Sequence, residues 1–285
     1  MTQINKSIIM LSCMFLAYTT STIAQDVLTQ QHMIVAHRGG KLEVEENTMA
    51  GFEQALANGM RALETDFHFT KDDKLVIMHD WNVMRMLGVD EEIETTNLAD
   101  LRRLHTPKGN KIPLAEEYTE LLSHYDYVYG EFEMKTSEEK FYPEERLHKY
   151  CDALYNLVMS KKPEHSVYVF TSFDERALKM MYQLHPNAKL CYILSGPLDE
   201  KTIIKALELH AYCIAGKLDK TTREMVVKAH NVGLTVSLWQ TNSPETWLRA
   251  AMLGADVSTD DAPVATKKWM DENCKWIKYQ LGPKN

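Results

Sequence analysis

Short apolar runs rich in β-branched and aromatic residues alternate with longer segments of helical periodicity along most of the sequence. A short apolar run between turn residues is typical of a buried strand, whereas apolar residues three and four positions apart predict a helix with one buried face. The strand pattern occurs in eight runs, at residues 33–36, 62–67, 128–134, 167–172, 189–194, 212–215, 234–238 and 256–258. The helical pattern lies between most of them, for instance at residues 48–58, 173–185, 199–209, 220–231 and 243–253.

This alternation predicts an α/β fold, a (β/α)8 TIM barrel, because eight repeated strand and helix units can close a parallel sheet. A doubly wound open sheet is the alternative, since it shows the same alternation with a different number of strands. The longest irregular stretch lies between residues 67 and 128, where 75–78 has the pattern of a short extra strand and 81–104 that of a loop with a helix. We interpret this stretch as a short excursion between strands 2 and 3, over the active end of a single domain spanning residues 25–285.

The first 24 residues differ from the rest of the chain. Lys6 is their only charged residue, an apolar run covers residues 8–18, and small or polar residues lead to Ala24. This pattern is typical of a signal peptide, and the apolar run is too short to span a bilayer. We therefore expect cleavage near Ala24 and export of the mature chain to the periplasm or the extracellular space. A lipoprotein anchored through Cys13 is the alternative, but Cys13 lies too early in the apolar run.

Composition restricts the partners of the protein more than its activity. With 45% hydrophobic and 25% charged residues, the chain has the composition of an ordinary globular protein. The formal net charge of −8 becomes −9 when Lys6 is removed with the signal peptide, so we expect small-molecule ligands, no nucleic acid and no stable membrane insertion. Four scattered cysteines remain, and we expect them to be buried free thiols: Cys151, Cys191, Cys213 and Cys274.

Carboxylates gather on one face of two predicted strands. Glu64 and Asp66 project to the same side of the second strand, because side chains alternate along a strand, and the third strand adds Glu133. Bare carboxylates inside a barrel are costly unless they are paired or bound to a metal ion. Glu64, Asp66 and Glu133 therefore predict a metal site with oxygen ligands, which suits Ca²⁺ or Mg²⁺.

Two histidines and two cationic residues adjoin these strands in the sequence. His37 follows the first predicted strand directly, and His79 follows the short strand over residues 75–78. Barrel enzymes carry their reactive groups at the carboxyl ends of the strands, and histidine can give or take a proton near neutral pH. Arg38 and Lys135 would balance the charge of a phosphate. The alternative is that both cations only form buried ion pairs with the carboxylates.

Four motifs in this region occur in order: His37-Arg38-Gly39, Glu46-Asn47-Thr48, Glu64-x-Asp66 and His79-Asp80. Others follow along the chain: Ile112-Pro113-Leu114, Glu116-Glu117, Glu133-Met134-Lys135, Ser172-Phe173, Leu238-Trp239 and Thr259-Asp260. Their order and spacing resemble the glycerophosphodiester phosphodiesterase family over nearly the whole mature chain. The resemblance implies a (β/α)8 barrel that hydrolyses glycerophosphodiesters, such as glycerophosphocholine or glycerophosphoethanolamine, to sn-glycerol 3-phosphate and an alcohol.

The resemblance also implies roles for individual residues. The counterparts of His37 and His79 act as general acid and base, with either assignment open. The counterparts of Glu64, Asp66 and Glu133 bind a divalent metal, for which Ca²⁺ and Mg²⁺ are both candidates. Those of Arg38 and Lys135 contact the phosphate.

Other residues are candidates for supporting roles. We expect Asn47 to cap the helix that follows it and Glu46 to orient a residue of the site. Trp239, at the end of the seventh predicted strand, is a candidate wall of the substrate pocket. Glu131 adds a carboxylate where the family often has a neutral polar side chain. It is a candidate fourth metal ligand, or a base that contacts the ligands without binding the metal. Pro263 comes one residue later than in the family's Thr-Asp-x-Pro motif, which predicts a changed rim at that end of the barrel.

Two other functions are compatible with the same pattern. A phospholipase D or C acting on lysophospholipid or sphingolipid can use the same barrel, but a net charge of −9 without a basic cluster argues against a lipid surface as partner. A non-catalytic barrel that binds phosphorylated ligands is the second alternative. The non-catalytic alternative is disfavoured because all seven site positions hold the expected residue types: His37, His79, Glu64, Asp66, Glu133, Arg38 and Lys135.

Overall fold

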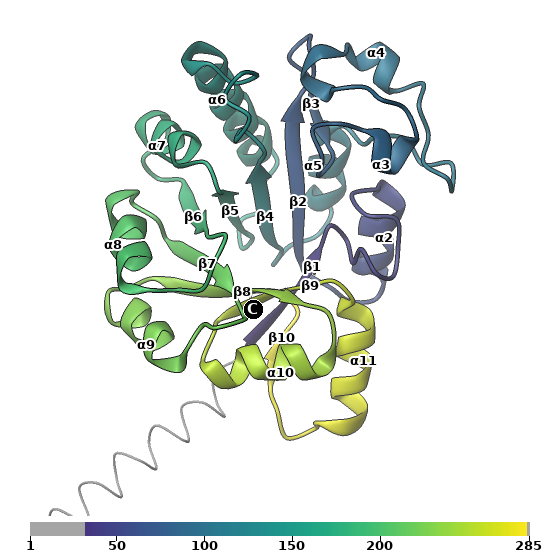
Figure 1. Ribbon diagram of the computed structural model, residues 1–285. Helices are drawn as coiled ribbons and strands as arrows, with labels where there is room; N and C mark the ends of the chain where they lie inside the picture. The colour runs from purple at the N-terminus through teal and green to yellow at the C-terminus, as the bar shows by residue number, and fades with distance from the viewer. Residues whose placement is uncertain (1–31, 284–285) are drawn as a thin grey trace, which may run out of the picture.

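Eight parallel strands form a closed barrel with helices around it (Figure 1). The structure, a computed structural model, describes residues 32–283, so the signal peptide predicted over residues 1–24, its cleavage at Ala24 and Cys13 lie outside the described residues. The barrel strands are β1 His32–His37, β2 Ala62–Phe69, β4 Tyr129–Met134, β5 Val167–Ser172, β6 Lys189–Ile193, β7 Cys213–Lys217, β8 Thr235–Thr241 and β9 Val257–Asp260. Because β1 pairs with β9 on one side and with β2 on the other, the predicted (β/α)8 barrel is confirmed and the doubly wound alternative is wrong.

Helices follow the strands and cover the outside of the barrel. The helices expected from periodicity are α2 Met49–Ala57, α7 Glu175–Leu184, α8 Glu200–Glu208, α9 Arg223–Asn231 and α10 Pro244–Leu253. The structure adds α5 Ala115–Ser123, α6 Glu144–Ser160 and α11 Pro263–Asn273. Several begin where a side chain accepts a free backbone N–H, as Thr48, Asp199 and Ser243 do for α2, α8 and α10.

The excursion between the second and third barrel strands is a small layer at the end of β2 (Figure 1). Its short strand β3, Leu75–Ile77, pairs antiparallel with β2, as expected from the sequence. The segment expected to hold a loop with one helix instead contains α3 Met84–Leu87, the 3₁₀ helix η1 Ile93–Thr95 and α4 Leu98–Leu101. A local apolar cluster that includes Val83, Ile93 and Leu101 holds these short elements together.

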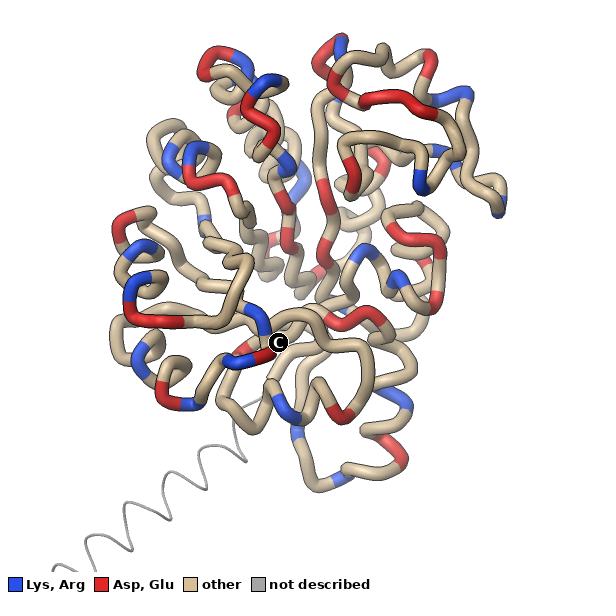
Figure 2. Tube along the Cα trace, in the orientation of Figure 1, with Lys and Arg blue, Asp and Glu red and all other residues tan. Residues whose placement is uncertain are grey.

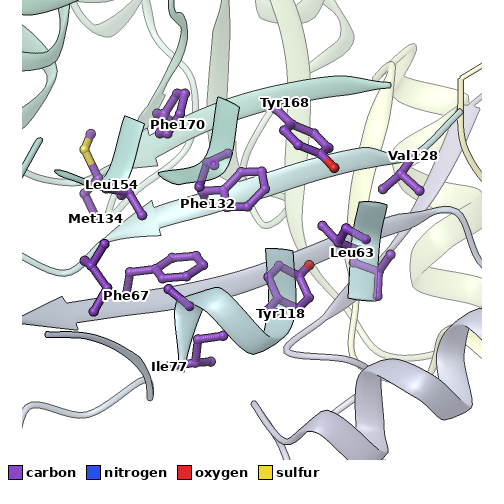
Figure 3. Packing of buried hydrophobic residues seen from close by; sticks show 14 of the residues in the cluster. Leu63, Phe67, Ile77, Tyr118, Val128, Phe132, Met134, Leu154, Tyr168 and Phe170 are labelled. Carbon is purple, nitrogen blue, oxygen red and sulfur yellow. The ribbon is translucent and has the colours of Figure 1, made fainter. Parts of the chain in front are cut away.

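Alternation along the strands divides the core into two parts. Outward-facing Leu63, Phe67 and Phe132 pack beneath the helices and against Tyr118 of α5 (Figure 3). Inward-facing residues fill the barrel and form a separate cluster: Met33, Val35, Ala62, Tyr129, Val169, Cys191, Cys213, Ala215 and Val257. Because Ala62 faces inward, the residues two and four positions later on β2, Glu64 and Asp66, face inward as well.

Two further expectations concern cysteines and membranes. Cys151, Cys191, Cys213 and Cys274 are buried and free, as predicted. Between residues 32 and 283, no helix combines the length and the apolar character that crossing a membrane requires. The C-terminal segment adds a two-residue strand that the sequence did not indicate, β10 Tyr279–Gln280, which pairs with β1.

Candidate active site

Three carboxylates converge inside the barrel, where β2 and β4 run side by side. The register places Glu64 beside Glu131 and Asp66 beside Glu133, and Figure 2 shows acidic positions along both strands. Glu64, Asp66 and Glu133 each offer an oxygen within 4.8 Å of the others, and in the described part of the chain they form the group able to hold a metal ion. Glu64 Oε1 and Asp66 Oδ1 are buried without a hydrogen-bond donor. The donor set and these oxygens, which accept no hydrogen bond, fit a hard divalent cation.

The protonation behaviour of two of these acids also reflects their crowding. Burial, together with the neighbouring charges of Asp66 and Glu133, raises the pKa of Glu64 well above its usual value. Burial also opposes ionisation of Asp66, but Lys135 and Arg38 outweigh it and hold the pKa of Asp66 below its usual value. The crowded carboxylates therefore carry an electrostatic cost that a cation bound between them would relieve.

Arg38 reaches the cluster from the turn after β1. Its backbone N–H lies 3.0 Å from Glu64 Oε2 and donates a hydrogen bond to it, and its Nε lies 3.5 Å from Asp66 Oδ2. Its Nη1 donates to Glu46 Oε1 at 3.0 Å. The residue has φ of 52°, in the left-handed region, and this local turn aims both its backbone and its side chain at the carboxylates. Glu46, proposed from the sequence to orient a residue of the site, thus contacts Arg38.

The expected helix cap at Asn47 is wrong. Thr48 caps α2 instead, because its hydroxyl accepts the N–H of Gly51 at 3.1 Å. Asn47 has φ of 54° and turns its side chain into the barrel, where Nδ2 donates to Asp66 Oδ2 at 2.8 Å and Oδ1 accepts from Thr65 at 3.0 Å. Asn47 therefore orients a candidate metal ligand.

Lys135 lies directly after β4 on the other side of the carboxylates. Its Nζ donates to Glu133 Oε1 at 2.8 Å and lies 3.6 Å from Asp66 Oδ1. Burial disfavours its charge, yet Glu133 and Asp66 raise the pKa of Lys135 above its usual value, so the ammonium stays charged. Arg38 and Lys135 thus flank the carboxylates with two fixed positive charges, although the three acids still outnumber them.

His37 is the last residue of β1, and a carboxylate contacts its ring at Nδ1. Its Nδ1 lies 2.5 Å from Asp261 Oδ1, and its Nε2 lies 3.8 Å from Glu64 Oε2. A carboxylate at Nδ1 favours the tautomer whose Nε2 is a free acceptor, and this nitrogen faces the carboxylate cluster. Burial lowers the pKa of His37 despite the opposing effect of its hydrogen bond to Asp261.

A carboxylate also holds the ring of His79 through Nδ1, but this carboxylate belongs to the next residue in the sequence. Its Nδ1 lies 2.6 Å from Oδ1 of the next residue, Asp80. Asp80 Oδ2 accepts from Arg85 Nε at 2.5 Å, and the two Nη atoms of Arg85 donate to Glu46 at 2.6 and 3.0 Å. Because Glu46 also binds Arg38, a continuous chain of charged hydrogen bonds connects the loops that carry the two histidines.

Two cavities meet at this cluster. The first, of about 260 Å³, extends over the barrel interior and is lined by both histidines, Glu64, Glu133 and, on its far wall, Phe173 and Trp239. The rings of Phe173 and Trp239 are perpendicular, with centroids 5.9 Å apart. The second cavity, of about 600 Å³, extends from His79 and Glu133 toward the excursion. Trp239 thus lies in a pocket wall, where the sequence had suggested it.

Glu131 lies on the same face of β4 as Glu133 but one step deeper in the barrel. Its Oε1 accepts the hydroxyl hydrogen of Tyr129 at 2.9 Å, and its oxygens lie outside the group able to hold a metal. Burial, with the charge of Glu133, raises the pKa of Glu131 to about 7, although the bond from Tyr129 opposes this. Its contacts therefore place it behind the candidate ligands, one of the two positions proposed for it.

Every residue singled out from the sequence reaches this end of the barrel, and two that sequence reasoning missed join them. Asp261 directly follows β9, in the Thr259-Asp260-Asp261-Ala262-Pro263 segment that is one residue longer than the family motif. This longer spacing was the signal in the sequence that could have drawn attention to Asp261. Arg85 lies six residues after His79, with no local pattern that marks it. Asp261 was missed because its partner His37 is distant in the sequence, and Arg85 because it joins the nearby Asp80 to the distant Glu46.

The chain is similar in sequence to known phosphodiesterases. The model of the glycerophosphoryl diester phosphodiesterase family matches residues 37–264. A glycerophosphodiester phosphodiesterase of Caldanaerobacter subterraneus subsp. tengcongensis is 28% identical over 239 residues, covering 80% of this chain and 94% of that protein. Human lysophospholipase D GDPD1 is 36% identical over 104 residues, or 30% of this chain and 32% of that protein.

Solved structures share the fold. An Oleispira antarctica phosphodiesterase in complex with the product sn-glycerol-3-phosphate has a TM-score of 0.77 at 22% identity and covers 86% of this chain and 99% of that one. A glycerophosphodiester phosphodiesterase from Parabacteroides distasonis has a TM-score of 0.73 at 22% identity, with the same coverage of 86% and 99%.

Proposed function

The chain belongs to the glycerophosphoryl diester phosphodiesterase family, and we infer from this membership that it is an enzyme that hydrolyses glycerophosphodiesters to sn-glycerol 3-phosphate and an alcohol. One observation supports this reaction in this chain beyond its family membership. Two histidines, each tied through Nδ1 to a carboxylate, lie beside a carboxylate cluster flanked by Arg38 and Lys135. These are the groups that phosphodiester hydrolysis requires: an acid, a base and positive charge around the phosphate.

The two histidines divide the proton transfers. As the oxygen of water forms its bond to phosphorus, one imidazole takes the proton of that water, and the other gives a proton to the alcohol oxygen as its bond to phosphorus breaks. The Nδ1 contacts to Asp261 and Asp80 orient both rings and leave each Nε2 as the reacting atom. Arg38 and Lys135 hold the phosphate while negative charge shifts onto its oxygens.

Glu64, Asp66 and Glu133 would hold a divalent cation, Ca²⁺ or Mg²⁺. When bound, it would polarise the phosphoryl group and offset its negative charge. The support for this proposal is the carboxylate geometry, with three acids within reach of one ion and two of their oxygens buried without a donor. Asn47 and the backbone of Arg38 keep these carboxylates in place by hydrogen bonds.

A product assay tests the proposed function. The purified protein is incubated with soluble glycerophosphodiesters and with lysophospholipids, each with Ca²⁺, with Mg²⁺ and after chelation. Release of sn-glycerol 3-phosphate from soluble diesters, lost on chelation and restored by one of the ions, is expected. Cleavage of lysophospholipids alone would favour the lipid-directed alternative, and no turnover of any diester would contradict the function.

We also propose that the enzyme acts outside the cytoplasm, because residues 1–24 have the pattern of a signal peptide. Mass spectrometry of the protein recovered from the periplasm or medium should find a chain that begins at Gln25. Recovery of the full-length chain from the cytoplasm alone would contradict export.

A further inference from the structure

His68 is a buried histidine on the inward face of β2 that the proposed mechanism does not use. It lies two residues beyond Asp66, so both side chains project to the same side of the strand. The ring lines the second cavity together with His79 and Glu133. It therefore borders the same space as a candidate catalytic residue.

Both ring nitrogens of His68 face acceptors that the protein supplies. Nδ1 lies 2.6 Å from Oε1 of Glu94, and Nε2 lies 3.4 Å from the backbone oxygen of His79. A carboxylate and a carbonyl both accept, and a ring protonated at both nitrogens donates to both. His68 thus keeps no free nitrogen for proton transfer with a substrate. His79 differs, because its contact with Asp80 through Nδ1 leaves Nε2 open.

Glu94 is itself held within the excursion. It lies in η1 and is buried, and its Oε1 accepts the hydroxyl hydrogen of Tyr142 at 3.1 Å. The same hydroxyl accepts the backbone N–H of Phe69 at 3.0 Å, which ties it to β2. Oε2 of Glu94 is buried and accepts no hydrogen bond from any described residue. Burial of a carboxylate with one unsatisfied oxygen is costly, and the ring of His68 is the ionisable partner that offsets this cost.

Strand β2 contacts the segment that carries His79 at two successive residues. The backbone N–H of Met78 donates to the carbonyl of Asp66 at 3.1 Å, and His68 contacts the carbonyl of His79. The strand that carries Glu64 and Asp66 therefore also holds the backbone of His79. A shift of about 1 Å in a reacting group can lower a rate about 10²-fold, so this backbone position bears on proton transfer.

Resting on the proposed function, we propose that His68 is a positioning residue for His79. Glu94 holds the ring of His68 at Nδ1, and Tyr142 holds Glu94. Nε2 of His68 then fixes the carbonyl of His79 beside the carboxylate cluster. Through Glu94, the excursion is a working part of the active site.

Three variants test the positioning role by steady-state kinetics. His68→Leu should lower kcat for a soluble glycerophosphodiester roughly 10- to 50-fold with KM changed less than about twofold, because the groups that hold the phosphate are untouched. His68→Gln can still donate to the carbonyl of His79 and should recover most of the loss. Glu94→Gln should lower kcat roughly 3- to 10-fold, since the ring loses its charged partner.

His32→Leu is the matched control. His32 is 2% exposed, as His68 is, and its ring nitrogens contact the Ala255 carbonyl at 2.5 Å and Ser258 Oγ at 2.6 Å, but it lines neither cavity. Its loss should lower the melting temperature but leave kcat unchanged in assays run well below that temperature. Equal kcat for His68→Leu and His32→Leu would overturn the proposal. If His68→Leu does not fold, an unchanged kcat in Glu94→Gln would overturn it instead.

A double variant separates positioning from direct action on the substrate. If His68 acts through His79, adding His68→Leu to His79→Ala should lower the remaining rate less than about twofold. A further fall as large as the one in the wild-type background would mean that His68 acts on the substrate itself, and the positioning role would be wrong.

An NMR measurement keeps the test independent of turnover. The amide of Asp80 shares its peptide group with the carbonyl of His79, so its nitrogen resonance should shift in His68→Leu, stay near the wild-type position in His68→Gln and not move in His32→Leu. An unchanged Asp80 resonance in His68→Leu would overturn the proposal. The expected shift in a protein whose wild type cleaves no diester would contradict the proposed function and leave the contact between His68 and His79 standing.

Discussion

Asp261 Oδ1 lies 2.5 Å from Nδ1 of His37, a residue 224 positions earlier in the chain. The contact exists because β1 lies directly beside β9, so the loop after β9 borders the end of β1 where His37 sits. Asp261 also lies 3.3 Å from Lys41 Nζ. Although burial opposes its ionisation, His37 and Lys41 keep the pKa of Asp261 below its usual value, and it remains a carboxylate able to orient the imidazole.

Asp261→Asn should reduce kcat by about 10- to 100-fold with little change in KM, because an amide can present its N–H to Nδ1 and favour the wrong tautomer. The measurement is steady-state hydrolysis of a glycerophosphodiester across pH, where the variant should also shift the limb of the profile that belongs to His37. Asp100→Asn is the control, since Asp100 forms an exposed pair with Arg103. An unchanged kcat and pH profile in Asp261→Asn would contradict the orienting role.

His37→Ala and His79→Ala should each lower kcat about 10²-fold or more, since each removes one of the two proton transfers. Circular dichroism should show an unchanged fold in both variants. His124→Ala removes an exposed histidine on the outside of the barrel and should leave the rate unchanged. Wild-type turnover in either site variant would rule out the two-histidine mechanism.

Arg85→Gln should lower kcat roughly 3- to 30-fold, because Arg85 joins Asp80 to Glu46 and so orients His79 indirectly. Arg85→Lys should restore only part of the rate, since an ammonium cannot bridge both carboxylates with the same geometry. Arg103→Gln, at an exposed ion pair, is the matched control. If Arg85→Gln were as active as this control, the bridge between the two loops would have no part in catalysis.

Glu64→Gln should raise the melting temperature of the metal-free protein by a few degrees at pH 8, because it removes one of three crowded buried charges. The same variant should lose the increase in melting temperature that Ca²⁺ or Mg²⁺ produces in the wild type. Thermal melts with and without each ion measure both effects. A wild-type response to metal in Glu64→Gln would remove Glu64 from the ligand set.

Asp260→Asn should become more stable relative to the wild type as pH rises. Burial raises the pKa of Asp260 to about 6 from its ordinary value of 3.8, against hydrogen bonds from Ala262, Thr266 and Thr241. Since the pKa of the folded state is the higher one, the contribution of Asp260 to stability is fully present below pH 3.8 and is lost as pH rises through 6. Denaturant unfolding at pH 4 and pH 8 should show a relative gain of about 2 kcal/mol for the variant.

The control for this measurement is Glu139→Gln, because the side chain of Glu139 is 80% exposed and its stability difference from the wild type should stay nearly constant with pH. A stability difference between Asp260→Asn and the wild type that does not change with pH would mean that Asp260 ionises normally in the folded protein.

Much of the fold and of the site was predictable because the relevant signals are local. The alternation of side chains along a strand is enough to place Glu64 and Asp66 on one face, and the position of His37 directly after a strand is enough to place it at the reactive end of a barrel. The cap of α2 shows the limit of such signals. Asn47 and Thr48 are both good capping residues, and only the presence of Asp66 nearby decided which side chain turned inward.

By itself, the sequence determined the order of the barrel strands, the faces of those strands and the residue types that carry the chemistry, because these depend on neighbours a few positions apart. Closure of the barrel decided the rest. It set Asp66 beside Glu133 through the register of β2 and β4, and it brought Asp261 to His37 and Arg85 to Glu46. Such contacts depend on where distant backbone segments end in space, and hydrogen bonding between strands with packing of the core fixes those positions.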